Sequence, residues 1–148
     1  MKASIRHATA LTALSLALFG MASVQAAGVP PMHKIDGIET VSGGIGDGEA
    51  AAIQSEARHW PLTLEFAIRD KAKSDYAADV NVLVRDAKGH TVLQTTSGGP
   101  FLLARLNPGQ YTVQASLDGK TLQQKVMVGH QPARHLFLWP AGTDESAS

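Results

Sequence analysis

The sequence predicts a mainly β fold, a seven- to eight-stranded antiparallel β-sandwich with one short N-terminal helix. Short runs in which apolar and polar residues alternate support this expectation. Turn-forming residues recur about every 8 to 12 residues, which is the spacing typical of sandwiches. The segment Leu106-Asn107-Pro108-Gly109 predicts a chain reversal, after which Tyr111 faces inward from a new strand, with Gly109 free to take a positive φ.

The N-terminus has the pattern of a secretory signal peptide. Lys2 and Arg6 precede an uncharged, Leu- and Ala-rich run over residues 8–22, and small residues before Ala26 suit signal peptidase. We therefore expect a signal peptide over residues 1–26, cleaved after Ala26, and a periplasmic or secreted protein. The apolar run is shorter than the roughly 20 residues of a membrane span, so no span is expected after signal removal, with an uncleaved anchor as the alternative.

Composition excludes several classes of function. The chain has 148 residues, a formal net charge of zero at pH 7 and no cysteine. Its length without the leader suits one domain. A near-neutral charge gives no basic patch for nucleic acid, so no nucleic-acid partner is expected. Without cysteine there can be no disulfide and no thiolate metal site, which favours a bacterial periplasm over a disulfide-rich scaffold.

The region before the sandwich divides into two parts. Residues 27–34, which contain two prolines, are expected to be a flexible lead-in. Residues 35–61 are expected to form a strand over 35–41, a Gly-rich turn over 43–48 and a helix over 49–60. Asp47 is the predicted helix cap, and Pro61 ends the helix with Trp60 against the core.

Residues 62–140 are expected to form the sandwich itself. Apolar residues alternate from Leu62 to Ile68, which predicts a half-buried strand followed by a polar connection over 70–78. Further strands are expected over residues 80–84, 90–95, 101–106, 110–117, 120–128 and 134–139. Asp86 and the pair Asp118-Gly119 predict hairpin turns. A polar tail over 141–148 is expected to be disordered.

Three segments carry a resemblance to a known domain family. They are the strand and D-x-x-G turn of residues 79–89, the Ser-Gly-Gly-Pro-Phe stretch of residues 97–101 and the L-x-P-G-x-Y-x-V motif of residues 106–113. Together they resemble the carboxypeptidase regulatory-like domains of the transthyretin-like, or prealbumin-like, sandwich superfamily. The resemblance covers roughly residues 79–128 and implies a fold, but little about activity. Residues 42–49 also resemble the N-terminal part of exported proteobacterial proteins of unassigned function that carry this domain.

Two enzyme groups share this superfold, and neither pattern is present. Hydroxyisourate hydrolases end in Tyr-Arg-Gly-Ser, whereas this chain ends in Thr-Asp-Glu-Ser-Ala-Ser. Intradiol dioxygenases hold iron with two tyrosines and two histidines. Here the two tyrosines are Tyr76 and Tyr111, and the second is a packing residue of the turn motif.

No catalytic, cofactor or metal site is predicted. The Gly-rich turn before the helix is one candidate for an anion site. Gly44 and Gly46 precede the helix, where amides attract anions, but the third glycine of a dinucleotide motif and the Lys-Ser/Thr of a P-loop are missing. A tight strand-to-helix connection is the preferred interpretation. Gly44, Gly46 and Glu49, with the aromatic Tyr76 and Trp139, form the predicted interaction surface.

Three further arrangements remain as alternatives. Asp86, His90 and Ser97 could supply the orienter, base and nucleophile of a hydrolase, although turn chemistry explains Asp86. His130 and His135 could hold a metal only through loop geometry. The pair Met32-His33 offers soft ligands for copper.

These observations predict a secreted or periplasmic, non-enzymatic module that binds another protein or the cell envelope through strand edges or loops. A carbohydrate-binding module that uses Tyr76 or Trp139 as a stacking platform is the alternative. A hydrolase or a metal-binding protein is the third expectation.

Overall fold

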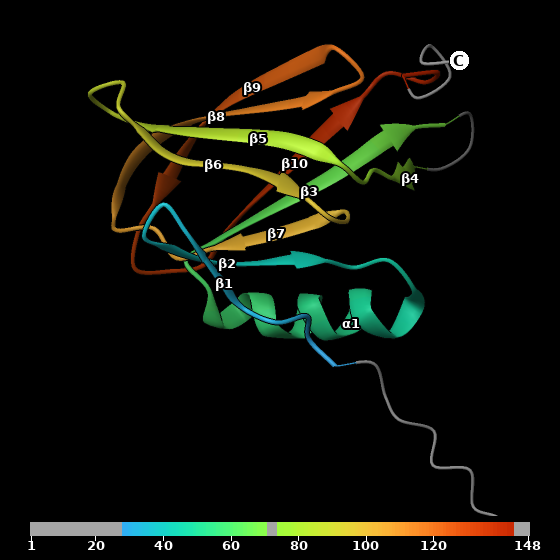
Figure 1. The fold of residues 1–148 in the computed structure, drawn as a ribbon, viewed down its shortest axis with the longest axis horizontal. Coiled ribbons are helices and arrows are strands. Elements are labelled where there is room, and N and C mark those ends of the chain that lie inside the picture. Colours follow the sequence, from blue (N-terminus) through green and yellow to red (C-terminus); the bar gives the residue numbers. More distant parts are fainter. Residues whose placement is uncertain (1–27, 71–73, 144–148) are drawn as a thin grey trace, which may run out of the picture.

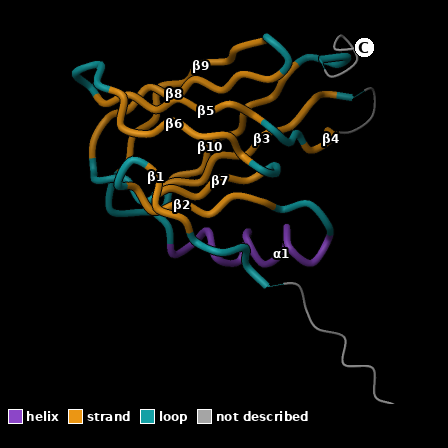
Figure 2. The backbone as a smooth tube through the Cα atoms, viewed as in Figure 1, coloured by secondary structure: helices purple, strands orange, loops and turns teal. Residues whose placement is uncertain are grey.

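Two packed β-sheets form a sandwich, and one helix lies on the outside of one of them (Figure 1). This computed structural model describes residues 28–70 and 74–143. The predicted signal peptide and its cleavage site lie outside these residues. Strand backbone makes up most of the described chain, as Figure 2 shows. The predicted fold class is therefore confirmed.

The larger sheet, sheet A, has the order β1-β2-β7-β3-β10, with β4 also paired to β3. Its strands are β1 (His33–Ile35), β2 (Ile38–Gly43), β3 (Leu62–Arg69), β4 (Ser74–Tyr76), β7 (Phe101–Ala104) and β10 (Ala133–Trp139). Sheet B has the order β6-β5-β8-β9. Its strands are β5 (Val80–Asp86), β6 (Thr91–Ser97), β8 (Gly109–Leu117) and β9 (Lys120–Val128).

The described chain contains the eight expected strands and two short ones that the sequence did not predict. Asp36 and Gly37, with φ angles of 51° and 83°, form a tight turn that pairs β1 with β2. The expected single strand over 35–41 is thus a hairpin, and the lead-in over 27–34 runs into β1 at its end. β4 lies inside the expected polar connection over 70–78 and pairs with the far end of β3.

The pairing of β10 with β3 is parallel, from Ala133 opposite Leu62 to Trp139 opposite Ile68. This corrects the expectation of an entirely antiparallel sandwich. β9 ends sheet B, and the short segment over 129–132 carries the chain across to sheet A, so β10 enters that sheet in the direction of β3. All other strand pairs of the described residues are antiparallel.

Helix α1 (Asp47–Glu56) and the 3-10 turn η1 (Ala57–His59) cover part of the outer face of sheet A. They enclose a second, smaller core, whose buried members are Val41, Ile53, Trp60, Phe101 and Leu103. Asp47 was predicted to cap this helix, and that prediction is wrong. Gly46 is the N-cap residue, no side chain makes a capping bond, and Asp47 is the first helical residue.

The main core lies between the two sheets and is built from the inward-facing residues of both. Phe66, Phe137 and Trp139 form its aromatic part, with ring centroids between 5.8 and 6.5 Å apart.

Gly109 starts β8 with a φ of 159°, which is near the extended region. This angle differs from the type II turn value that the Pro108-Gly109 pair suggested.

The end of the described chain is more ordered than the predicted tail over 141–148. Residues 141–143 form a turn, and Thr143 is buried, with its hydroxyl donating to the carbonyl of Pro140 at 2.6 Å. The remainder of the predicted tail, residues 144–148, lies outside the described residues. Within the described ranges, none of the helical segments has the length and apolar character needed to cross a bilayer.

Candidate functional site

The Gly-rich turn is a tight connection between β2 and α1. Gly44 has a φ of 103°, and a Cβ atom there would lie 2.5 Å from Cδ2 of Phe101. The amide of Gly44 donates a 2.8 Å hydrogen bond to Oε1 of Glu49. Gly46 also has a positive φ, 95°, but faces open space. Glu49 thus satisfies the turn backbone, and the turn offers no pocket lined with free amides at Gly44.

Phe101 brings together two segments that the sequence placed in one predicted surface. Its ring packs beneath Gly44 and lies 5.7 Å from the ring of Tyr76, centroid to centroid. Phe101 is fully buried, whereas Tyr76 on β4 keeps 56% of its surface exposed. Gly44 and Tyr76 therefore do lie over one common residue, which is not among the predicted site residues.

An ion pair lies beside this aromatic contact. Nη2 of Arg134 on β10 is 2.6 Å from Oε2 of Glu65 on β3, and the guanidinium carbon lies 5.8 Å from the Phe101 centroid. Glu65 is opposite Phe101 in the β3–β7 register, so all three share the outer face of sheet A. The only sequence signal for this pair was a charged residue at an outward position of each strand.

Exposed apolar side chains complete the surface. Ile45, next to Gly44, is 65% exposed, and Leu136, two residues after Arg134 on the same face of β10, is 47% exposed. We call Ile45, Tyr76 and Leu136, with the Glu65–Arg134 pair among them, the Tyr76 patch. Apart from Ile45, which lies in the loop between β2 and α1, its members belong to strands of sheet A.

Trp139 does not belong to any surface, which corrects its place in the predicted interaction set. The side chain is fully buried in the main core, and its Nε1 donates a 2.9 Å hydrogen bond to the carbonyl of Lys120. A parallel strand pairing that the sequence did not reveal places it against Ile68. The prediction that Trp139 forms a stacking surface is therefore wrong, whereas Tyr76, the other ring named for that role, is exposed.

The suggested hydrolase residues do not form a site. Ser97 is fully buried, and its hydroxyl donates to the carbonyl of Gly99 at 2.7 Å. His90 precedes β6 at the other end, roughly 20 Å away along the strand, and its side chain is 75% exposed.

Asp86 is committed to its turn, as the sequence predicted. Its Oδ1 accepts the amides of Lys88 and His90, both at 2.9 Å. These hydrogen bonds hold the pKa of the Asp86 carboxyl below its ordinary value, and the bond from the His90 amide has the largest effect. The positive φ of Gly89, 81°, completes the turn.

The histidines considered as metal ligands lie apart in the fold. His130 is in the loop after β9 and shares a hollow of about 180 Å³ with His59, whereas His135 lies within β10. Met32 is exposed, and His33 contributes its carbonyl to a 3.4 Å bond from the Thr40 hydroxyl. Among the described residues, no three His, Asp or Glu side chains gather as a metal site.

Two of the strand edges are occupied by other parts of the chain. Oδ2 of Asp36, at the β1–β2 turn, accepts the amide of Gln94 on edge strand β6 at 3.1 Å. Nε2 of Gln124 on β9 donates to the carbonyl of Leu136 on β10 at 2.6 Å. These contacts reduce the number of unpaired backbone amides and carbonyls that a partner strand could bind at these two edges.

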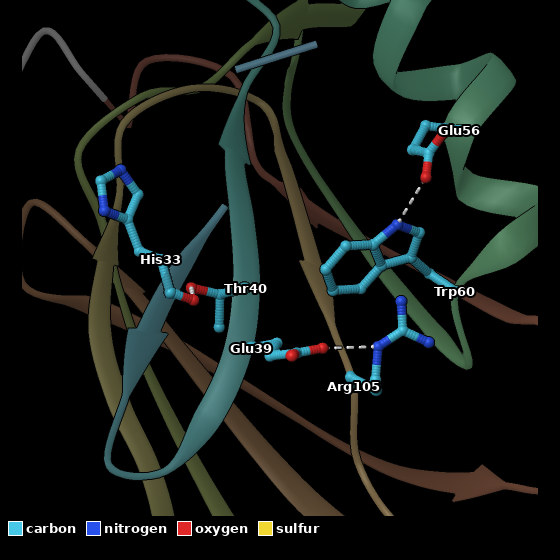
Figure 3. A network of polar contacts seen from close by, with 6 residues as sticks. All are labelled: His33, Glu39, Thr40, Glu56, Trp60 and Arg105. Carbon is cyan, nitrogen blue, oxygen red and sulfur yellow. Dashed lines mark hydrogen bonds and ion pairs between the residues drawn. The ribbon is translucent and has the colours of Figure 1, made fainter. Parts of the chain in front are cut away.

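A polar network joins the end of the helix to sheet A (Figure 3). Nε of Arg105 lies 2.8 Å from Oε2 of Glu39, and its guanidinium carbon lies 4.4 Å from the centroid of the Trp60 ring. Nε1 of Trp60 donates to Glu56 at 3.2 Å. Each charged group in this network already has a partner. We therefore interpret the network as structural, holding the end of the helix on sheet A.

Models of known protein families and curated protein sequences give no match to this chain.

Proposed function

We propose that this protein is a secreted or periplasmic, non-enzymatic β-sandwich module that binds another protein of the cell envelope through the Tyr76 patch. The resemblance to carboxypeptidase regulatory-like domains suits this proposal, because such sandwiches serve as binding modules as well as enzyme parts. The signal-like residues 1–26 supply the expected route to the envelope.

The observation that carries the proposal is the exposure of a supported tyrosine. Tyr76 rests on the buried Phe101 ring, yet more than half of its surface faces solvent. A ring fixed from below loses little conformational freedom when a partner covers it, and tyrosine is enriched among residues that dominate binding energy. Ile45 and Leu136 add apolar area around it.

The charges of the patch favour a protein partner over lipid. The Glu65–Arg134 pair presents both signs, with Arg134 about half exposed. Aromatic residues and arginine are enriched in protein interfaces, whereas an anionic membrane surface selects for an excess of cations.

Site-specific photocrosslinking tests the proposal. A photoreactive phenylalanine analogue in place of Tyr76 should crosslink one envelope protein in cells that produce the full chain. The same analogue in place of Thr121, on sheet B, is the matched control and should not give that product. With the purified partner, Tyr76→Ser should weaken binding about 30-fold, as expected for a central interface tyrosine.

Two outcomes would contradict the proposal. One is the absence of any product specific to position 76. The other is a product whose binding is unchanged in the Tyr76→Ser/Leu136→Ser variant, provided that its circular dichroism and urea midpoint match those of the parent protein.

A further inference from the structure

Sheet B has an outer face that is turned away from sheet A, with helix α1 on the opposite side of the molecule (Figure 1). Most inward positions of its strands are apolar, so the alternate positions face outward. Most of these outward side chains are uncharged amides and hydroxyls, among them Asn81, Gln94, Thr96, Gln114, Ser116 and Gln123.

Hydrogen bonds between neighbouring strands hold these side chains in place. Oγ1 of Thr96 donates to Oδ1 of Asn81 at 2.9 Å, and Nε2 of Gln114 donates to Oε1 of Gln123 at 2.9 Å. The hydroxyls of Ser116 and Thr121 are 2.7 Å apart. A ligand that binds here meets polar groups whose orientation is largely set, which lowers the entropy lost on binding.

Two hollows lie side by side on this face. One, of about 420 Å³, is lined by Asn81, Leu83 and Gln114, and the other, of about 380 Å³, by Arg85 and Lys125. Nη1 of Arg85 lies 3.4 Å from Oε1 of Gln114, so the two hollows meet at this contact. Their volumes fall within the range of small-ligand sites, about 300–1,000 Å³.

Two basic side chains lie close together at one end of this face. Arg85 and Lys125 both lie opposite Thr112, on either side of it in the sheet. The four strands of sheet B contain a single carboxylate, Asp86, which lies at the end of β5 and lines the second hollow together with the two cations. Its Oδ1 already accepts two backbone amides. The second hollow therefore favours an anionic group.

We propose that the outer face of sheet B binds an oligosaccharide that contains uronic acid. Amides and hydroxyls both donate and accept hydrogen bonds, as sugar hydroxyls do, and Leu83 gives an apolar floor for the C–H groups of a sugar ring. The carboxylate of an acidic sugar then contacts Arg85 and Lys125 through charge-assisted hydrogen bonds. This site is separate from the Tyr76 patch, which lies on sheet A.

The test compares two ligands that differ only at the carboxylate. β-1,4-linked mannuronate hexamers and β-1,4-linked mannose hexamers share one backbone, so calorimetry of the full chain with each isolates the contribution of charge. We expect mannuronate to bind at least about tenfold more tightly than mannose. Added salt should reduce this preference.

Variants locate the site on the face. Arg85→Met/Lys125→Met should abolish the preference for mannuronate, and Gln114→Ala should weaken both ligands. Lys34→Met, which removes an exposed cation of β1, is the control and should change neither affinity. Equal affinity for the two hexamers, no binding of either, or an equal effect of Lys34→Met would overturn the proposal. Urea unfolding of each variant verifies that the fold is retained.

Discussion

The phenolic hydroxyl of Tyr111 donates a 2.7 Å hydrogen bond to the carbonyl oxygen of Asn107. The bond closes the turn at Pro108 and Gly109, and so ties the start of β8 to the segment that leaves β7. The Tyr111 ring is buried in the main core. This arrangement resembles the tyrosine corner of Greek-key sandwiches, in which a tyrosine near a strand start bonds to backbone a few residues upstream.

Removal of that hydroxyl should destabilise the protein without changing its core packing. Tyr111→Phe leaves the Asn107 carbonyl without this donor, and we expect the free energy of unfolding to fall by about 0.5–1.5 kcal/mol. Urea unfolding followed by tryptophan fluorescence measures the change. Tyr76→Phe is the matched control and should stay within about 0.5 kcal/mol of the parent. An equal loss in both variants would contradict the assigned role.

Stability should also depend on this group at alkaline pH. Burial, with a smaller contribution from the Asp86 carboxylate, raises the pKa of the Tyr111 hydroxyl above its ordinary value. The stability that results is present below the unfolded pKa, about 10, and is lost as the pH rises through the folded pKa. Urea midpoints measured from about pH 8 to about pH 11 should therefore fall less steeply for Tyr111→Phe than for Tyr76→Phe. Identical slopes would count against this assignment.

Local chemistry explains which parts of the fold could be predicted. The alternation from Leu62 to Ile68 predicts a strand, and β3 is confirmed there. The predicted half-burial is wrong, because Thr63 and Ala67 on its other face are buried as well. Asp118 and Gly119, with φ angles of 48° and 77°, form the predicted two-residue hairpin turn between β8 and β9. In each case, the signal lies in residues that are neighbours in the sequence.

Pairings between distant segments explain the rest. β4 exists because Tyr76 pairs with Ala67 across a connection with no strand signal, and Trp139 is buried because β10 joins β3 in parallel. The contact of Gly44 with Phe101 has the same origin, since Gly44 directly follows β2, whose last residue, Gly43, pairs with Phe101 on β7. No local sequence pattern specifies which distant strands pair with each other. The Tyr76 patch could therefore be identified only from the three-dimensional structure.

The two glycines of the predicted surface should respond differently to substitution. Both have positive φ, so alanine is strained at either position by about 1–2 kcal/mol. At Gly44 the added methyl also meets Phe101, whereas Gly46 faces open space. Gly44→Ala should therefore cost more free energy of unfolding than Gly46→Ala, by about 1–3 kcal/mol of overpacking. Equal costs in urea unfolding would show that Phe101 does not restrict this turn.

Substitution of Trp139 separates a core role from a surface role. Trp139→Phe removes the bond to the Lys120 carbonyl and leaves part of the indole volume empty, and we expect the free energy of unfolding to fall by about 1–3 kcal/mol. Because the side chain is buried away from both proposed binding surfaces, crosslinking at Tyr76 and mannuronate affinity should match those of the parent protein below the unfolding transition. Acrylamide should quench the fluorescence of the folded parent weakly, since both tryptophans, Trp60 and Trp139, are buried. Unchanged stability combined with lost ligand affinity would instead place Trp139 on a binding surface.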